Sequence, residues 1–192
     1  GFVFVMSYAR ALVDRGRPGE AARVLAAAIT RLPSEASLFH DLAVAARAAG
    51  EIAEAVRAED AALAIDPGNA AAHNGRGLLH VDAGETAEAA AAFTRAVTID
   101  ESNATYWANL GSARRAGADP TGADQAYARA LALDPAHADA ANGRGVLLVQ
   151  AGQAGQAIDW FTRALATTPD FHEARLNLGI ACQEAGRPAE AA

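Results

Sequence analysis

Apolar and small side chains recur at helical spacing along almost the whole chain. They fall every three or four positions in segments of about fourteen residues, and short polar links separate these segments, which is the pattern of amphipathic helices. No run alternates Val, Ile or Thr with polar residues, as a half-buried strand would. Hydrophobic residues make up 52 % of the chain but aromatic residues only 6 %, so alanine, the best helix former, carries much of the apolar content. The sequence therefore predicts an all-α protein.

The helical segments are copies of one unit that repeats every 34 residues without an insertion. Two sets of alanines keep this spacing: Ala21, Ala55, Ala89, Ala123, Ala157 and Ala191, and Ala28, Ala62, Ala96, Ala130 and Ala164. A glycine set and a proline set follow the same period: Gly16, Gly50, Gly84, Gly152 and Gly186, and Pro33, Pro67, Pro135 and Pro169. Ala118 replaces one glycine and Glu101 one proline. A fixed period of this length indicates a repeat architecture.

Each unit predicts two helices. The first ends at the repeated glycine, which can adopt the left-handed conformation of a C-terminal cap. The second starts two or three residues later, with Pro18, Pro120 and Pro188 near its first turn, and ends before an Asp-Pro or an equivalent, because proline cannot continue a helix. Small residues at fixed sites let the helices approach closely. Larger side chains are expected to fill the gaps between them: Leu25, Phe93, Tyr127 and Phe161.

The most regular copy carries a family resemblance. Its key positions are Trp107, Leu110, Gly111, Ala123, Tyr127, Ala130 and Pro135. This set resembles the tetratricopeptide repeat, from which Arg114 departs at a position that is usually Tyr. We assign repeats to 2–35, 36–69, 70–103, 104–137 and 138–171, with a partial repeat at 172–192, in a single solenoid domain over 1–192. The resemblance implies a right-handed α-solenoid whose first helices line a concave groove that usually holds a peptide or another protein.

The net charge and the amino-acid composition of the chain exclude some classes of function. A formal charge of −7 argues against nucleic acid as a partner, since phosphate binding requires a basic surface. All sixteen cationic residues are Arg, which indicates a GC-rich genome and favours a bacterial source. Cys182 is the only cysteine, so a disulfide within the chain and a thiolate metal cage are excluded. No apolar run is long enough to insert into a membrane.

The compartment stays open, with the cytoplasm slightly favoured. The apolar start of the chain has no basic region and no cleavage site, so it does not read as a signal peptide. The chain does not begin with Met, so we expect a processed or excised piece.

Two features of the implied groove are candidates for partner binding. An asparagine recurs once per repeat, and an amide can both donate to and accept from a peptide backbone: Asn74, Asn109, Asn142 and Asn177. Apolar residues form a strip that would suit an amphipathic segment: Leu78, Val81, Val146, Val149, Leu176 and Ile180. Ser112 lies at another groove position. The alternatives are that the asparagines are merely tolerated on an exposed face and that neighbouring helices bury the apolar strip.

The charges of the groove favour a particular partner. Members of the family that grip a C-terminal carboxylate use Lys, Asn and Arg, and this chain has no Lys. Its acidic groove positions are Asp41, Asp82, Asp139 and Glu173. An acidic tail is therefore not expected, and a basic or neutral polar partner fits better.

The third repeat departs from the pattern in its polar residues. Arg76 takes a position that is Leu in other repeats, and it shares one stripe with His73 and His80. The preceding second helix supplies Glu59 where other copies have Phe or Tyr. A buried guanidinium needs a partner, so we predict a partly buried pair of Glu59 with Arg76 or His73. We interpret this junction as structural; the alternative is a functional polar pocket. Arg144 takes the same Leu position in the fifth repeat.

The sequence gives no sign of catalysis, a metal or another cofactor. The five histidines and one cysteine form no triad in a sensible context, and His73 and His80 are about 10 Å apart along a helix. We therefore predict a non-enzymatic scaffold that binds a peptide or protein segment in its groove. The alternatives are the recognition arm of a larger modifying enzyme, of the glycosyltransferase or sulfotransferase type, and a scaffold that self-associates through unfinished ends.

Overall fold

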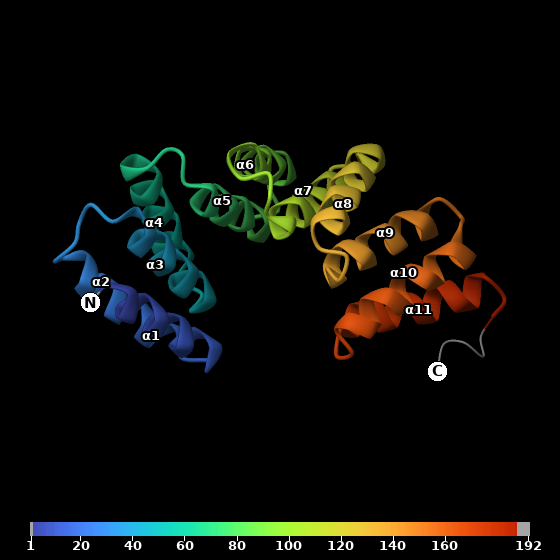
Figure 1. The fold of residues 1–192 in the computed structure, drawn as a ribbon, viewed down its shortest axis with the longest axis horizontal. Coiled ribbons are helices and arrows are strands. Elements are labelled where there is room, and N and C mark those ends of the chain that lie inside the picture. The colour runs from blue at the N-terminus through green and yellow to red at the C-terminus, as the bar shows by residue number, and fades with distance from the viewer. Residues whose placement is uncertain (1, 188–192) are drawn as a thin grey trace. The chain divides into compact units, whose positions relative to one another are not determined.

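The structure is a computed structural model that describes residues 2–187, and all of its regular elements in that range are α-helices (Figure 1). The helices are α1 (Phe2–Asp14), α2 (Pro18–Ile29), α3 (Ala36–Ala48), α4 (Ile52–Ile65), α5 (Ala70–Asp82), α6 (Thr86–Ile99), α7 (Ala104–Ala116), α8 (Pro120–Leu133), α9 (Ala138–Gln150), α10 (Ala154–Thr167) and α11 (His172–Glu184). The all-α prediction is confirmed. Pro188 and the expected second helix of the sixth repeat lie outside the described residues.

The helix ends are set by the residues that the repeat places there. Pro18 and Pro120 occupy the first turns of α2 and α8, where a missing N–H breaks no helical bond. Gly50 ends the turn after α3 with a φ of 80°. Ala118, which stands in the glycine position of its repeat, adopts the same left-handed conformation with a φ of 58°. The repeat therefore imposes the turn even where the residue is unfavourable for it.

The helices pack as the repeat predicts. In the five repeats whose two helices are both described, the first helix packs on the second, as in α3 with α4 and α9 with α10. The contacts divide the chain into two compact units, Gly1–Asp100 and Glu101–Ala192, which are described separately below. In the first unit α3 contacts both α1 and α5, and in the second α9 contacts both α7 and α11. The first helices of each unit thus form a continuous layer.

The core of each unit consists of small residues around a few large ones. Leu25, Phe93, Tyr127 and Phe161 are all buried, as predicted. In the second unit the ring of Tyr127 lies between Gly111 and Gly143. A Cβ on these glycines would come within 2.7 and 2.3 Å of the ring, respectively, so only glycine allows this approach.

Among the described residues, no helix combines the length and the apolar character that crossing a bilayer requires.

Candidate binding surface on the first helices

The first helices of each unit present one layer to the outside, which we call the first-helix face. Each unit has its own such face, formed by α1, α3 and α5 in the first unit and by α7, α9 and α11 in the second. All predicted groove residues lie on these helices.

Two cavities open on either side of α3 in the first unit. The α1–α3 cavity, of about 270 Å³, is lined by residues of α1 and α3 with Leu25 of α2. The α3–α5 cavity, of about 440 Å³, is lined by residues of α3 and α5, among them the predicted Leu78, together with Glu59 of α4. Val44 lines both cavities and is 45 % exposed. An apolar side chain therefore stands at the point where the two cavities meet.

A partly buried histidine–glutamate pair lies beneath this face. Nδ1 of His40 lies 2.9 Å from Oε1 and 3.2 Å from Oε2 of Glu59. The Glu59 side chain is only 1 % exposed. Burial raises the pKa of its carboxyl above the ordinary value, while the bond from His40 and the charge of Arg76 oppose the rise. Gly75 provides the space, because a Cβ there would come within 1.8 Å of Oε1.

The predicted partners of Glu59 are wrong, although its burial was expected. Arg76 instead forms an ion pair with Asp60, the next residue on α4. The ring of His73 lies 3.0 Å from the carbonyl oxygen of Pro67. Consecutive residues of a helix point about 100° apart, so Glu59 and Asp60 face different neighbours.

The remaining members of the polar stripe lie near the surface. Nδ1 of His80 lies 2.6 Å from Oε2 of Glu85, and the side chain of Arg76 is 31 % exposed. In the fifth repeat, Arg144 has a similar environment: it donates to Asp124 at 2.8 Å and lies 4.6 Å above the ring of Trp160. Each arginine at the leucine position thus pairs with an exposed aspartate of the preceding helix and not with a buried carboxylate.

A second carboxylate of the first-helix face, that of Asp41, lacks a hydrogen bond at one of its oxygens. Asp41 lines the α1–α3 cavity, and its Oδ2 is buried without a hydrogen-bond partner. Burial raises the pKa of this carboxyl, and the charges of His40 and Arg10 oppose the rise. By contrast, Asp82 at the α3–α5 cavity accepts two bonds from Arg47, at 2.5 and 2.8 Å, which lower its pKa.

The asparagines of the second unit bond to each other. Asn177 of α11 donates from Nδ2 to Oδ1 of Asn142 on α9 at 3.0 Å. Asn142 in turn donates to Oε1 of Glu173 at 3.1 Å and is only 5 % exposed. The amide of Asn142 therefore tethers α9 to α11, whereas Asn177 is partly exposed beside it.

The other predicted groove residues are open to solvent to different degrees. Asn74 and Leu78 on α5, Asn109 on α7 and Val146 on α9 are partly buried. Ser112 is exposed, and its hydroxyl lies 3.1 Å from the Tyr127 hydroxyl. On α11, Leu176 is 65 % and Ile180 is 41 % exposed. Neighbouring helices therefore do not bury this end of the apolar strip.

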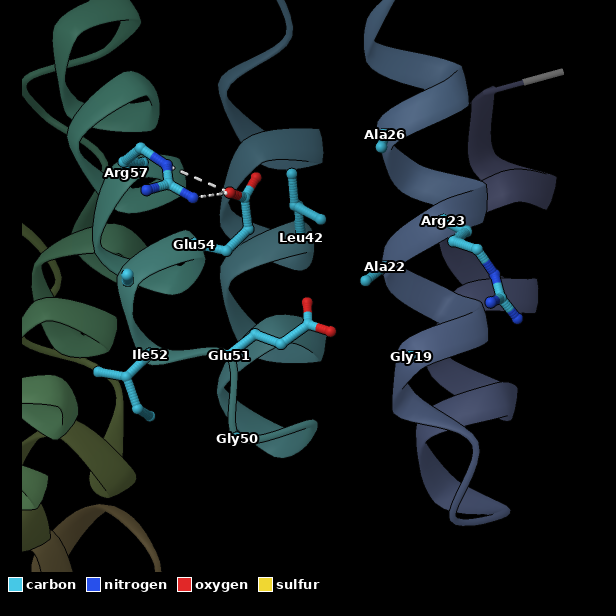
Figure 2. Close-up of a pocket in the computed structure, with 11 residues that line it drawn as sticks. Gly19, Ala22, Arg23, Ala26, Leu42, Gly50, Glu51, Ile52, Glu54 and Arg57 are labelled. Atoms are coloured by element: carbon cyan, nitrogen blue, oxygen red, sulfur yellow. Dashed lines mark hydrogen bonds and ion pairs between the residues drawn. The ribbon is translucent and has the colours of Figure 1, made fainter.

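A third cavity lies away from the first-helix face. It occupies about 820 Å³ and lies between the second helices α2 and α4 (Figure 2). Gly19, Ala22 and Ala26 form its α2 side, and Figure 2 shows Glu54 paired with Arg57 on its α4 side. Small residues on α2 leave room for the cavity, and two of its charged groups, Glu54 and Arg57, already pair with each other.

Sequence reasoning missed His40 and underrated Asp41. The available signal was the repeat itself: His40 stands 34 residues before Asn74, at a position that is partly or fully buried in the third, fourth and fifth repeats. The predicted pair joins α4 to the helix that follows it, whereas the partner of Glu59 lies on α3, the helix that precedes it.

Comparisons with known proteins agree with this geometry. A sequence model described as "Tetratricopeptide repeat" matches residues 9–70, 40–104 and 108–170. The chain therefore belongs to the tetratricopeptide repeat family. A comparison with curated proteins gave no match.

Many solved structures share the fold. A structure of MamA is 26 % identical, with 83 % of this chain and 87 % of that chain covered at a TM-score of 0.68. YrrB, described as a TPR protein with an unusual peptide-binding site, is 23 % identical, with 88 % of each chain covered and a TM-score of 0.68. PilF of Pseudomonas aeruginosa is 20 % identical, with 97 % of this chain and 86 % of that chain covered and a TM-score of 0.82.

Proposed function

We propose that this chain is a non-enzymatic scaffold that binds a peptide or protein segment along its first-helix face. The observation that carries the proposal is the pair of cavities on either side of α3 that meet at the exposed Val44. Adjacent pockets on neighbouring helices suit successive side chains of one extended or helical segment. The relative YrrB is described as having a peptide-binding site, which supports the same kind of partner.

The chemistry of the face favours a basic or neutral polar segment with apolar residues. Asp14 and Asp41 line the α1–α3 cavity, and Glu59 and Asp82 line the α3–α5 cavity. Apolar contact comes from Val44 in the first unit, and in the second from Leu176 and Ile180 on α11. Apolar burial supplies most of the affinity, since exposed ion pairs add little.

The geometry of the second unit limits which asparagine amides can bond to a peptide backbone. The bond between Asn142 and Asn177 would compete with a peptide for the same groups. We propose that the partly exposed Asn177 makes the contact with the peptide and that Asn142 holds it in place. Replacing Asn177 with Ala should then weaken capture of a peptide that lies on α11.

The proposal is tested by selecting peptides from a displayed random library on the immobilised chain. Val44→Asp should weaken the selected peptides at least about tenfold, because it replaces the apolar contact between the two cavities with a hydrated carboxylate. Val56→Asp is the matched control, since Val56 is 36 % exposed on the second helix α4. Equal losses in both variants, or no selected peptide, would count against the proposal.

A further inference from the structure

The α1–α3 cavity combines apolar walls with one unsatisfied carboxylate oxygen. Ala9, Val13, Leu25 and Val44 line it together with Asp41, whose Oδ2 is buried without a hydrogen-bond partner. A buried carboxylate oxygen that lacks a donor raises the free energy of the folded chain. A donor that enters the cavity would remove this cost.

The charged neighbours of Asp41 do not supply that donor. The Nδ1 atom of His40 is directed at the Glu59 carboxylate, 2.9 Å away. Arg10 lines the same cavity but is exposed, and none of the described hydrogen bonds or ion pairs joins it to Asp41. Asp14 adds a second carboxylate to the lining.

The size of the cavity limits what can enter. Its volume of about 270 Å³ is just below the range of about 300–1,000 Å³ that is usual for small-molecule sites. It therefore has room for one long side chain. The Asp41 side chain is partly exposed, so rotation about its Cβ–Cγ bond can bring either oxygen to the entrant.

We propose that the α1–α3 cavity binds one cationic side chain, arginine in preference to lysine, of the segment that lies on the first-helix face. This specificity rests on the proposed function. The methylene stem contacts the apolar walls and the charged group bonds to Asp41. Arginine is preferred because its planar guanidinium can donate two bonds to one carboxylate. Arg10 is then an internal competitor for the same carboxylate.

The probes are three small amides followed by NMR of the labelled chain: Nα-acetyl-arginine, Nα-acetyl-lysine and Nα-acetyl-citrulline N-methylamides. The arginine probe should shift amide signals of α1 and α3 and the carboxyl carbon of Asp41. Citrulline has nearly the same shape without the charge, and it should bind at least about tenfold more weakly. Equal binding of the arginine and citrulline probes, or shifts confined to other helices, would overturn the proposal.

Two variants test the role of the carboxylate. Asp41→Asn should reduce the affinity for the arginine probe to that for citrulline. Glu88→Gln makes the same charge change at an exposed position of α6 and should leave the affinity unchanged. Unaltered arginine binding by Asp41→Asn would overturn the proposal. If that variant does not fold, the carboxyl-carbon shift of the unmodified chain decides.

Arg10→Gln removes the competing guanidinium, so the arginine probe should bind more tightly; weaker binding would contradict the competition.

Failure of this inference is distinguishable from failure of the proposed function. Selected peptides that require Val44 but carry no cationic residue would sustain the function and overturn the cationic pocket. No selected peptide, together with binding of the arginine probe at Asp41, would sustain the pocket and remove the function.

Discussion

Glu59 is held in the interior by His40, whose Nδ1 lies 2.9 Å from its carboxylate, and by the absence of a side chain at Gly75. In the third to fifth repeats the position of Glu59 holds an aromatic ring, and in the first it holds Leu25. Tyr127, two repeats later, packs against Gly143 in the same way as Glu59 packs against Gly75. The Glu59 carboxyl group therefore occupies, against Gly75, the place that the ring of Tyr127 occupies against Gly143.

Gly75→Ala should destabilise the first unit. The new Cβ would lie 1.8 Å from Oε1 of Glu59, and the displaced carboxylate would lose its bond to His40. We expect a net loss of about 1–3 kcal/mol in the free energy of unfolding, measured by urea denaturation. Gly155→Ala is the control, because nothing lies within 4 Å of its new Cβ. A Gly75→Ala variant as stable as the control would contradict this packing.

Glu59→Gln should change how stability depends on pH. Burial raises the pKa of Glu59 above its ordinary value of 4.5, so the folded state binds this proton more tightly than the unfolded state. Its contribution is complete below pH 4.5 and is lost as the pH rises through the folded pKa. The variant lacks this loss, so its stability relative to the parent should increase from about pH 4.5 upward.

Urea denaturation of both chains between about pH 2 and 8 measures this difference. Asp82→Asn provides a control of opposite sign, because Arg47 lowers the pKa of Asp82. Its stabilising contribution is present above the ordinary value of 3.8 and is lost as the pH falls through the lowered pKa. A constant difference between Glu59→Gln and the parent over the whole range would contradict the assigned burial.

Tyr127 should contribute mainly through its ring. The side chain is 1 % exposed, and its hydroxyl bonds only to the exposed Ser112 among the described contacts. Tyr127→Phe should therefore cost less than about 1.5 kcal/mol, while Tyr127→Ala should cost about 3–5 kcal/mol. Thermal and urea unfolding measure both, and similar losses in the two variants would indicate that the hydroxyl stabilises the fold more than the ring does.

The exposed end of α1 predicts self-association. Phe4 and Tyr8 stack with their centroids 6.3 Å apart and are 72 % and 47 % exposed. Leu38 and Leu42, one repeat later, are buried by packing at the same positions. Sedimentation should show association that increases with concentration and is weakened by Phe4→Ser. A strict monomer at high concentration would remove this prediction.

Much of the fold could be predicted because the residues that end the helices and fill the core recur in successive copies of the repeat. Pro18, Pro120 and the glycine positions fix the helix ends, and even Ala118 follows the turn of its set. The buried rings of Phe93 and Tyr127 were likewise expected from their spacing. These features depend on local geometry and on contacts that every copy shares.

The details of the candidate site could not be predicted in the same way. The bond of Glu59 to His40 and the bond of Asn142 to Asn177 depend on which way side chains turn between neighbouring helices. The repeat determines where each residue lies along its helix. Which side chains bond to each other depends on the particular residues that two neighbouring helices bring together. The single domain over 1–192 stays a prediction, since the contacts divide it into two compact units.

The measurement that tests the central claim most directly is a hydrogen-exchange footprint of the chain with and without a selected peptide. Binding along the first-helix face should slow exchange in α3 and α5, or in α9 and α11, and leave α4 and α10 unchanged. The same peptide should give no protection to the Val44→Asp variant within the first unit. Protection confined to the second helices, as around the cavity between α2 and α4, would contradict the account.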